Sequence, residues 1–466
     1  MRTGIYRSTA IHTIYNYIIQ DMAPSSTFIL LLATFLVSLA APSDASTFDL
    51  RAKLNHPYAG SLLSNHDMLR DAARASKARR AWNAASRVAR ASNYGTIVPM
   101  PIRPFGRLHH TLTVSIGTPP QPRTLILDTG SDLIWTQCKL FDTRQHREKP
   151  LYDPAKSSSF AAAPCDGRLC ETGSFNTKNC SRNKCIYTYN YGSATTKGEL
   201  ASETFTFGEH RRVSVSLDFG CGKLTSGSLP GASGILGISP DRLSLVSQLQ
   251  IPRFSYCLTP FLDRNTTSHI FFGAMADLSK YRTTGPIQTT SLVTNPDGSN
   301  YYYYVPLIGI SVGTKRLNVP VSSFAIGRDG SGGTFVDSGD TTGMLPSVVM
   351  EALKEALVEA VKLPVVNATD HGYEYELCFQ LPRNGGGAVE TAVPVPPLVY
   401  HFDGGAAMLL RRDSYMVEVS AGRMCLVISS GARGAIIGNY QQQNMHVLFD
   451  VENHEFSFAP TQCNQI

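Results

Sequence analysis

Short apolar runs separated by turn residues fill most of this chain from about Leu108 onwards. The runs LTVSIG, TLILDTG, TFTFG, IFFG, YYYYVPLIGISVG and VLFDV alternate with stretches rich in Gly, Pro, Asn and Ser. Runs of this length and composition are typical of strands in an all-β fold. A single segment in this region, Leu345–Val361, places apolar residues at helical spacing, and Pro346 lies in its first turn. We therefore expect an all-β protein with few helices.

The apolar pattern repeats in the two halves of the chain. The first half contains LTVSIGTPPQPRTLILDTGSDLIW and later GILGIS. The second contains VPLIGISVGTKRL, then GTFVDSGDTTGML, and later AIIGNY. Asp128 and Asp337 occupy matching places in the repeat, each at the start of an Asp-(Ser/Thr)-Gly turn. Two such halves predict two similar β lobes with a cleft between them.

The repeated turn has the composition of a paired-carboxylate site. Gly130 and Gly339 let the chain turn sharply and leave backbone N–H groups facing the two carboxylates. Thr129 and Ser338 offer hydroxyls that brace one turn against the other. Two carboxylates held together share a proton, so one acts as a general base on water while its protonated partner polarises a carbonyl. The expected reaction is hydrolysis of peptide or protein substrates, without metal or cofactor and without a covalent intermediate.

The first residues have the pattern of a targeting segment. Phe28–Ala41 is a run of 14 apolar or small residues, which is short for a bilayer span and suited to a signal-peptide core. A small-x-small cleavage site follows at residues 43–45. We expect a signal peptide over residues 1–45, with Met22 as an alternative start and a signal anchor as the alternative interpretation. After its removal we expect no membrane span.

A basic segment over residues 46–103 follows. Its Ala/Arg-rich part, residues 66–92, favours helix, and residues 46–100 hold nine Lys and Arg against three Asp. It is either a solvated helical linker or a removable pro-segment of a zymogen. Under the second hypothesis its Lys and Arg pair with the cleft carboxylates at neutral pH and release them in acid.

Charge and cysteine content place the chain in a class of proteins. The formal charge of +6 resides in residues 1–100, and the remainder holds 31 basic and 31 acidic residues. This balance argues against nucleic-acid binding. We expect a monomer in the secretory pathway, destined for the extracellular space, cell wall or vacuole, with a plastid as the less favoured alternative. Sequons for glycosylation begin at Asn179, Asn265 and Asn367.

An even number of cysteines in a secreted chain predicts disulfide bonds, although their pairing stays open. Two Cys-x4-Cys pairs, at 165/170 and 180/185, also have the superficial appearance of a zinc knot, which an oxidising compartment disfavours. The disulfide candidates are Cys138, Cys165, Cys170, Cys180, Cys185, Cys221, Cys257, Cys378, Cys425 and Cys463.

Six motifs resemble those of pepsin-like aspartic proteases, in particular the atypical plant branch that includes nepenthesin and nucellin. They are IGTPPQ, DTGSDLIWTQC, KGELASETFTF, FGCG, FSYCL and IIGNYQQQN, and the resemblance covers roughly residues 108–463. It implies the bilobal pepsin-like fold, with an N-terminal lobe over residues 104–285 and a C-terminal lobe over 286–466. It also implies catalytic Asp128 and Asp337, Ser131 bonded to Asp128, a flap tyrosine at Tyr191, and Trp135 steadying that tyrosine. Acidic optimum and inhibition by pepstatin-type compounds follow from the same resemblance.

The second loop departs from the family pattern. The family has a motif close to DSGTTxTxLP where this chain has DSGDTTGMLP, so Asp340 replaces a hydroxyl residue and Gly343 replaces a threonine. The family hydroxyl donates to the outer oxygen of the carboxylate at 337, which an ionised Asp340 cannot do. Two carboxylates about 4 Å apart repel by roughly 4 kcal/mol at an effective dielectric of 20. We expect a three-carboxylate cluster that resets the pH optimum, weak activity or none, with a side chain turned into solvent as the alternative.

The sequence departs from the family pattern in two smaller ways, and it leaves two alternative functions to consider. The flap YGSATTKG is about one residue shorter than the family form, and two family cysteines after Cys138 are replaced by Phe141 and Arg144. A protease-fold binding protein, similar to the cereal xylanase inhibitors of this family, is the main alternative function. A serine hydrolase is the other, because residues 309–313 fit G-x-S-x-G with Ser311 at the centre, although that motif needs a strand-to-helix elbow.

Overall fold

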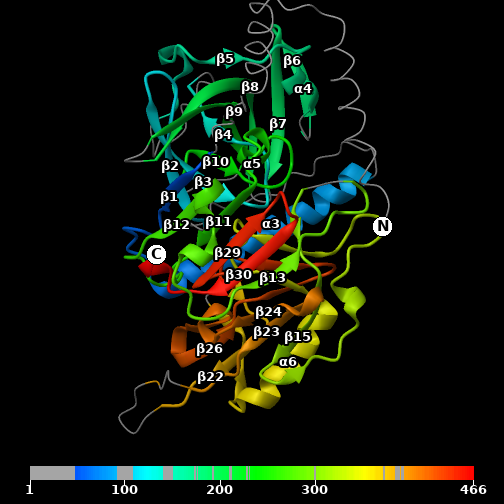
Figure 1. Ribbon diagram of the computed structural model, residues 1–466. Coiled ribbons are helices and arrows are strands. Elements are labelled where there is room, and N and C mark those ends of the chain that lie inside the picture. Colours follow the sequence, from blue (N-terminus) through cyan, green and yellow to red (C-terminus); the bar gives the residue numbers. More distant parts are fainter. Residues whose placement is uncertain are drawn as a thin grey trace, which may run out of the picture. The chain divides into compact units, whose positions relative to one another are not determined.

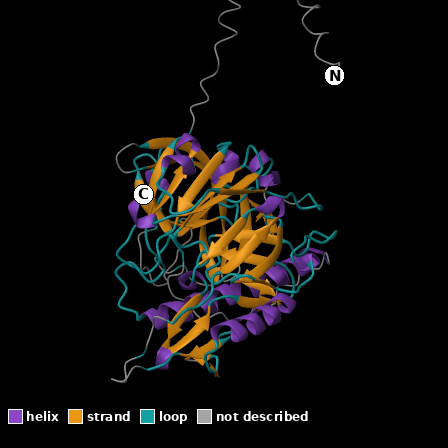
Figure 2. Cartoon of the chain, turned by 60° about the horizontal axis from the view of Figure 1, so that its bottom comes forward, coloured by secondary structure: helices purple, strands orange, loops and turns teal. Residues whose placement is uncertain are grey.

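Strands dominate the computed structural model of the chain, and helices are confined to a few segments (Figures 1 and 2). The expected all-β class is therefore confirmed. The predicted signal peptide, residues 1–45, lies outside the described part of the chain. The structure describes residues 48–91, 109–139, 151–172, 175, 177–191, 194–208, 212–226, 229, 231–298, 301–370, 373–383, 389 and 393–466.

The first half of the chain forms a large sheet in which one strand, β2, also pairs with β8. Its long members β8 and β9 pair in antiparallel register, with a shift of register between Thr195 and Thr196. In sheet order the strands are β2 (Thr111–Ile116), β3 (Gln121–Asp128), β10 (Gly234–Gly237), β4 (Trp135–Gln137), β9 (Val213–Ser226), β8 (Ala194–Phe207), β7 (Lys184–Tyr191) and β6 (Thr177–Ser181), with β5 (Ala161–Ala162) beside β8.

The second half forms four smaller sheets. The first has the order β14 (Tyr303–Tyr304), β17 (Thr334–Asp337), β28 (Ala435–Gly438), β18 (Met344–Pro346) and β27 (Ser429–Gly431). The second is β16 (Lys315–Arg316), β15 (Leu307–Val312), β23 (Leu398–Phe402) and β24 (Ala407–Leu410). The third is β19 (Val365–Val366), β22 (Cys378–Gln380), β26 (Arg423–Leu426) and β25 (Met416–Val419), and the fourth pairs β20 (Thr369–Asp370) with β21 (Tyr373–Glu374).

The repeat in the sequence is a repeat in strand register. In the first lobe β3 runs parallel to β10, so that Asp128 lies opposite Gly237. In the second lobe β17 runs parallel to β28, so that Asp337 lies opposite Gly438. A third strand, β4 or β18, then pairs antiparallel with β10 or β28. Each half therefore delivers its aspartate at the end of the same three-strand unit, which confirms two similar lobes.

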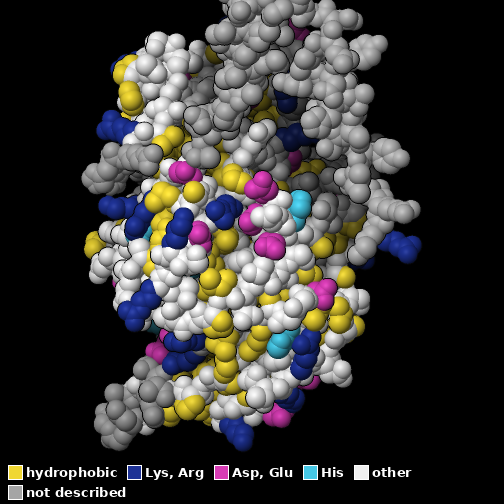
Figure 3. All heavy atoms as spheres, in the orientation of Figure 1, with side chains coloured by type: hydrophobic (Ala, Val, Ile, Leu, Met, Phe, Trp, Pro, Cys, Tyr) yellow, Lys and Arg dark blue, Asp and Glu magenta, His cyan; other side chains and the backbone are white. Residues whose placement is uncertain are grey.

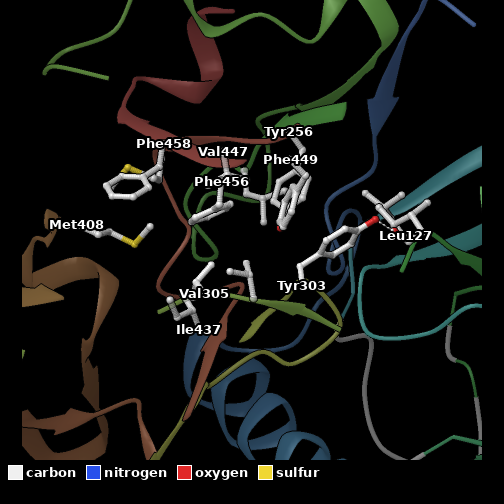
Figure 4. Packing of buried hydrophobic residues seen from close by; sticks show 14 of the residues in the cluster. Leu127, Tyr256, Tyr303, Val305, Met408, Ile437, Val447, Phe449, Phe456 and Phe458 are labelled. Carbon is white, nitrogen blue, oxygen red and sulfur yellow. Dashed lines mark hydrogen bonds between the residues drawn. The ribbon is translucent and has the colours of Figure 1, made fainter. Parts of the chain in front are cut away.

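A six-stranded sheet joins chain segments from both lobes and from the basic segment. Strand β11 of the first lobe pairs with β29 near the C-terminus, and Phe254 stacks on Phe449 with ring centroids 4.8 Å apart. Figure 4 shows Phe449, Phe456 and Tyr303 in one cluster beneath this sheet. In order its strands are β1 (Leu50–Leu54), β12 (Ser268–Phe272), β11 (Arg253–Cys257), β29 (Met445–Asp450), β30 (Glu455–Pro460) and β13 (Gln288–Ser291).

Strand β1 was not anticipated, although its sequence carries the signal. In FDLRAKL the residues Phe48, Leu50 and Leu54 are buried while Arg51 and Lys53 are exposed, which is the alternation of a half-buried strand. All five residues of β1 pair with β12. The basic segment therefore contributes part of the core and is more than a solvated linker.

Two long helices were expected and both are present, with revised ends. Helix α3 spans Asn65–Ala91, close to the predicted 66–92, and Ser64 caps it by accepting the Asp67 N–H at 3.1 Å. Helix α6 spans Ser347–Val361, because Leu345 and Pro346 belong to β18 and Pro346 precedes the first turn. The other α-helices of the described residues are short: α4 (Arg168–Thr172) and α5 (Leu245–Gln248).

All ten cysteines form disulfide bonds, as expected, and the zinc-knot interpretation is wrong. The Cys-x4-Cys pairs are cross-linked to each other, so their sulfurs are not available as metal ligands. The bonds are Cys138–Cys221, Cys165–Cys180, Cys170–Cys185, Cys257–Cys463 and Cys378–Cys425.

The described surface agrees with the charge balance of the sequence. On the face in Figure 3, basic and acidic side chains are interspersed. The sequon residues Asn179, Asn265 and Asn367 are exposed, as acceptors of glycosylation must be. Among the described helices none is both long and apolar enough to cross a bilayer.

Candidate active site

The two Asp-(Ser/Thr)-Gly turns meet with their carboxylates side by side. Asp128 and Asp337 are buried, and each accepts the N–H of the glycine two residues later, at 2.9 and 2.8 Å. A Cβ atom at Gly130 would lie 2.7 Å from an oxygen of Asp337, and one at Gly339 would lie 2.3 Å from an oxygen of Asp128. Each turn needs glycine because the carboxylate of the other lobe occupies the adjacent space.

The second residues of the turns brace the lobes. The N–H of Thr129 donates to Ser338 Oγ at 3.1 Å, and the N–H of Ser338 donates to Thr129 Oγ1 at 2.8 Å. Both hydroxyls also donate to backbone carbonyls across the junction, those of Val336 and Leu127. This reciprocal brace was predicted from the motif, and it sets the separation of the carboxylates.

The outer oxygens of the two aspartates have different partners. Ser131 Oγ donates to Oδ2 of Asp128 at 2.7 Å, as the family resemblance implied. The corresponding oxygen of Asp337 accepts no hydrogen bond from the described residues. The residue that matches Ser131 in the second turn is Asp340, which when ionised has no proton to donate.

Asp340 is fully buried, so the alternative in which it turns into solvent is wrong. Its Oδ1 accepts the N–H of Gly343 at 2.9 Å, and its carbonyl accepts the N–H of Asn439 at 2.7 Å. Gly343 has a φ of 67°, and a Cβ there would lie 2.4 Å from Gln441 Oε1. The two departures from the family motif thus belong together: Asp340 caps a left-handed turn that only glycine fits.

An arginine of the basic segment lies across both carboxylates. Arg79 of α3 donates to Asp128 through Nη1 at 3.2 Å and Nη2 at 2.9 Å. Nη2 also donates to Oδ1 of Asp337 at 3.3 Å and pairs with Oδ2 at 3.2 Å. Its side chain is 13% exposed. The expected pairing of a basic residue with the cleft carboxylates is therefore present, and the guanidinium occupies the space between them.

A second contact holds α3 against the catalytic loop. The buried Ser76, one turn before Arg79, accepts the N–H groups of Thr341 and Thr342 at 2.9 and 3.2 Å. The sequence contained no signal for Ser76, because a serine in an Ala-rich helix is ordinary. Only the position of the helix across the loop gives it a role.

Burial and charge separate the proton affinities of the pair. Burial raises the pKa of Asp337 to about 7, with Asp128 and Asp340 adding to the rise and Arg79 and the Gly339 N–H opposing it. Burial also acts to raise the pKa of Asp128, but Arg79, Ser131 and the Gly130 N–H outweigh it and hold that pKa below its ordinary value. At a pH between the two pKa values one carboxylate holds a proton while the other is ionised, as a general acid–base pair requires.

The residues expected at the flap are only partly described. Trp135 is fully buried on β4, and Tyr191 ends β7, but the side chain of Tyr191 lies outside the described part. Sequence reasoning missed a link two residues earlier, where the Tyr189 hydroxyl donates to the carboxylate of Asp132, four residues after Asp128. Burial and the charge of Asp241 raise the pKa of Asp132 to about 6.

The G-x-S-x-G motif does not form a nucleophile elbow. Ser311 lies within β15, which turns into β16 as a hairpin, so the strand-to-helix turn is missing. Its hydroxyl bonds His401 Nε2 at 2.7 Å across the β15–β23 pair. This is a cross-strand contact on a sheet, and the serine-hydrolase interpretation is wrong.

Comparisons with known proteins agree with this geometry. A family model described as xylanase inhibitor N-terminal matches residues 110–274, and one described as xylanase inhibitor C-terminal matches residues 302–460. The chain is 38% identical over 359 residues to aspartic proteinase nepenthesin-1 of Nepenthes gracilis, covering 76% of this chain and 78% of that protein. It is 30% identical over 440 residues to aspartyl protease 37 of Oryza sativa subsp. japonica, covering 87% and 91%.

Solved structures show the same fold at lower identity. The crystal structure of EDGP aligns with a TM-score of 0.57 and 19% identity, over 77% of this chain and 93% of that one. Basic 7S globulin from soybean aligns with a TM-score of 0.57 and 19% identity, over 76% and 93%. At this identity the likeness concerns architecture.

Proposed function

This chain belongs to the pepsin-like plant aspartic protease family, and we propose that it is a secreted aspartic endopeptidase made as a zymogen. The observation that carries the proposal is the pair of buried carboxylates, Asp128 and Asp337, that the reciprocal Thr129–Ser338 hydrogen bonds hold together. Such a pair activates water without a metal.

The proposed reaction follows from the neighbours of each carboxylate. With the basic segment removed, ionised Asp128, steadied by Ser131 and the Gly130 N–H, accepts a proton from a water between the carboxylates. Protonated Asp337 donates a hydrogen bond to the substrate carbonyl. The water oxygen adds to the carbonyl carbon, the C–N bond breaks, and the leaving nitrogen takes up a proton. Products are a new carboxyl terminus and a new amino terminus.

The zymogen part of the proposal rests on Arg79 and Ser76. A guanidinium between both carboxylates leaves no space there for water or a peptide carbonyl. Arg79 stabilises the ionised form of Asp128 and so lowers its pKa. As pH falls through that lowered pKa, Asp128 takes up a proton and the ion pair with Arg79 is lost. Acid is therefore expected to free the cleft, and the reaction then needs one carboxylate of the released pair ionised.

The decisive experiment is hydrolysis of a denatured globular protein by the full chain across pH 2–7, with and without pepstatin. Asp128→Asn is the inactive control, and Asp340→Thr restores the family hydroxyl. Pepstatin-sensitive cleavage by wild type and none by Asp128→Asn supports the endopeptidase. Cleavage by Asp340→Thr alone means that Asp340 silences the site. No cleavage by either folded protein after acid treatment contradicts the proposal and favours a binding protein.

Secretion is a separate part of the proposal. The signal-peptide pattern, five disulfides and three exposed sequons support entry to the secretory pathway. We expect a chain expressed in plant cells to lose its first residues, to enter the extracellular space or vacuole as a monomer, and to lose mass on treatment with an N-glycosidase. A full-length, unglycosylated chain in the cytosol contradicts it.

A further inference from the structure

Three histidines come from the basic segment and from the residues just before the first strand of the N-terminal lobe. His56 follows β1, and His109 and His110 precede β2. His56 and His110 are 4% and 5% exposed, and their ring centroids are 6.1 Å apart. The carbonyl of His110 accepts the N–H of Leu127, the residue before Asp128, at 3.0 Å. We call His56, His110 and His109 the histidine row.

The hydrogen bonds of His56 require a neutral ring. Nε2 lies 2.9 Å from the carbonyl oxygen of Phe261, which can only accept, so this nitrogen carries the proton. Nδ1 accepts the backbone N–H of Tyr58 at 3.1 Å, so this nitrogen is unprotonated. A second proton on the ring would face the Tyr58 N–H directly and break that bond. The Tyr58 hydroxyl in turn donates to the carbonyl of Met68 in α3, so the strain reaches the helix that carries Arg79.

Among the described residues His110 has no hydrogen-bond partner that would stabilise a positive charge. Neither of its ring nitrogens bonds any described residue, and the ring is buried against His56. An imidazolium there would be desolvated, without an acceptor, and beside a second titratable ring. The neutral ring is tolerated, because it packs as an aromatic side chain.

The charged groups around the histidine row do not compensate for protonation. His56 faces Asp263 and Arg264, one of each sign, on the loop between β11 and β12. That arginine also donates to the carbonyls of Ser61 and Leu63 in the turn before α3.

The rings of His110 and His109 also lie near titratable or charged groups. His110 faces His56 and His109, and His109 faces Arg79, Asp128 and Asp340. The two carboxylates near His109 already pair with Arg79 or cap the catalytic loop. A positive charge on His109 would therefore compete with Arg79 for the same two carboxylates.

We propose that the histidine row is the acid sensor that releases the basic segment from the cleft. The inference rests on the proposed zymogen and names the side chains that respond first as the pH falls. Protonation of His56 or His110 breaks the packing of the turn between β1 and α3. The helix then withdraws Arg79 and Ser76 from the catalytic loops.

The sign of the pH dependence follows from burial. Burial lowers the pKa of His56 to about 4, of His109 to about 4 and of His110 to about 3. Rings freed by release return to about 6.5. The released state then binds more protons between these values, so release is favoured as pH falls below about 6.5. Asp128, whose pKa is held below its ordinary value, takes up a proton only in stronger acid.

The test replaces histidines of the row by side chains that do not titrate, in a chain that cannot cleave itself. The full chain carries Asp337→Asn throughout, and hydrogen exchange with mass spectrometry follows the amides of β1 and of residues 68–76 from pH 7.5 to 3.5, corrected for intrinsic exchange. His110→Phe removes a ring without hydrogen bonds and keeps an aromatic of similar size. His56→Gln keeps a donor for the Phe261 carbonyl. Each variant is expected to need more acid, with the opening at pH 5 reduced about 30-fold.

The matched control is His446→Gln. His446 is fully buried, with its pKa likewise lowered to about 4, but it bonds Ser255 and packs on Phe271 and Tyr281. Burial alone causes that lowered pKa, and the hydrogen bond and ring contacts of His446 are with residues outside the basic segment. His446→Gln should therefore leave the opening curve unchanged.

Two results would overturn the inference. One is an opening curve for His56→Gln and His110→Phe that coincides with that of the Asp337→Asn background. The other is a background chain whose amides at residues 68–76, in α3, stay protected down to pH 3.5. Thermal unfolding at pH 7.5 verifies that each variant is folded, and His56→Gln carries the test if His110→Phe is not. Because the exchange measurement needs no catalysis, failure of the proposed protease activity in the hydrolysis assay remains distinguishable from failure of the sensor.

Discussion

At the scale of single residues, the catalytic loops show how one position changes an otherwise symmetric site. Ser131 donates to Asp128, whereas Asp340, its counterpart, accepts from Gly343 and leaves an oxygen of Asp337 without a hydrogen bond from the described residues. The two aspartates share a motif and a backbone geometry. Their different pKa values come from their neighbours.

The variant Asp340→Asn tests the effect of the Asp340 charge on Asp337, because Asn has nearly the same size and shape as Asp. Asn keeps the acceptor for the Gly343 N–H and removes a charge that raises the pKa of Asp337. In the proposed reaction Asp337 acts in its protonated form, so activity is expected to fall as pH rises through its pKa. A lower pKa therefore moves the alkaline limb of the kcat/KM profile to lower pH, by about one unit. A limb that does not move, in a folded and active variant, would show that Asp340 lies outside the titrating cluster.

The link between Tyr189 and Asp132 gives a stability prediction. The Tyr189 hydroxyl lowers the pKa of the buried Asp132, so Tyr189→Phe should raise it above its present value of about 6. The resulting loss of stability, about 1–3 kcal/mol, is present at pH 7 and vanishes at pH 4, where Asp132 is protonated. Urea unfolding at both pH values, in the Asp337→Asn background, measures it.

Tyr187→Phe is the matched control for that measurement. Tyr187 is fully buried on the same strand and bonds the neutral hydroxyl of Thr196 at 3.2 Å. Its loss should cost a similar free energy at pH 7 and pH 4. Equal pH dependence in the two variants would contradict a charged acceptor at Asp132.

At the scale of elements, the basic segment combines two different kinds of attachment. Strand β1 completes the six-stranded sheet and buries Phe48, Leu50 and Leu54 in the core. Helix α3 reaches the catalytic loops through polar contacts, those of Ser76 and Arg79. Apolar burial is insensitive to pH, whereas an ion pair with carboxylates is not. We therefore expect the helix, rather than β1, to respond to acid.

Arg79→Gln should weaken the hold of α3 on the two carboxylates and so open the site to substrate. Without the guanidinium the two carboxylates lose their shared cation, and we expect activity at pH 6–7 to rise at least tenfold over wild type. Lys77→Gln is the control, because Lys77 lies on the same helix and is exposed. Initial rates on a quenched peptide, measured directly after dilution from neutral storage, give the comparison. Equal rates for all three proteins would show that Arg79 does not limit access to the cleft.

At the scale of the whole molecule, the disulfides differ in how much chain they close. Cys257–Cys463 spans 206 residues and fastens the C-terminus to β11, whereas Cys165–Cys180 spans 15 within one lobe. In the chain-entropy model, loops of these sizes contribute about 5 and about 3 kcal/mol.

Replacing each pair by serines tests that difference. We expect the Cys257→Ser, Cys463→Ser variant to lose more stability than the Cys165→Ser, Cys180→Ser variant, by about 2 kcal/mol. Urea unfolding at pH 7 measures both. The opposite order would show that local strain or residual structure in the unfolded chain outweighs loop size.

Much of the fold and the centre of the site could be predicted from the sequence. Alternation of apolar residues predicted strands, and the repeated Asp-(Ser/Thr)-Gly turn identified Asp128 and Asp337 together with the brace between Thr129 and Ser338. These features are local, because a strand pattern or a glycine turn depends on neighbouring residues. Even strand β1 was readable in FDLRAKL, although the basic composition around it favoured a helical interpretation.

Only the tertiary structure decided which distant groups meet. Arg79 is one of several arginines on an Ala-rich helix, and nothing within that helix distinguishes it from its neighbours. The burial of Asp340, its bond to Gly343, and the histidine row likewise depend on segments that are far apart in the chain or on loop conformation. Local pattern therefore determined the elements and the catalytic pair, while charge pairing and proton affinity were set by packing, because both depend on three-dimensional distance and on exclusion of water.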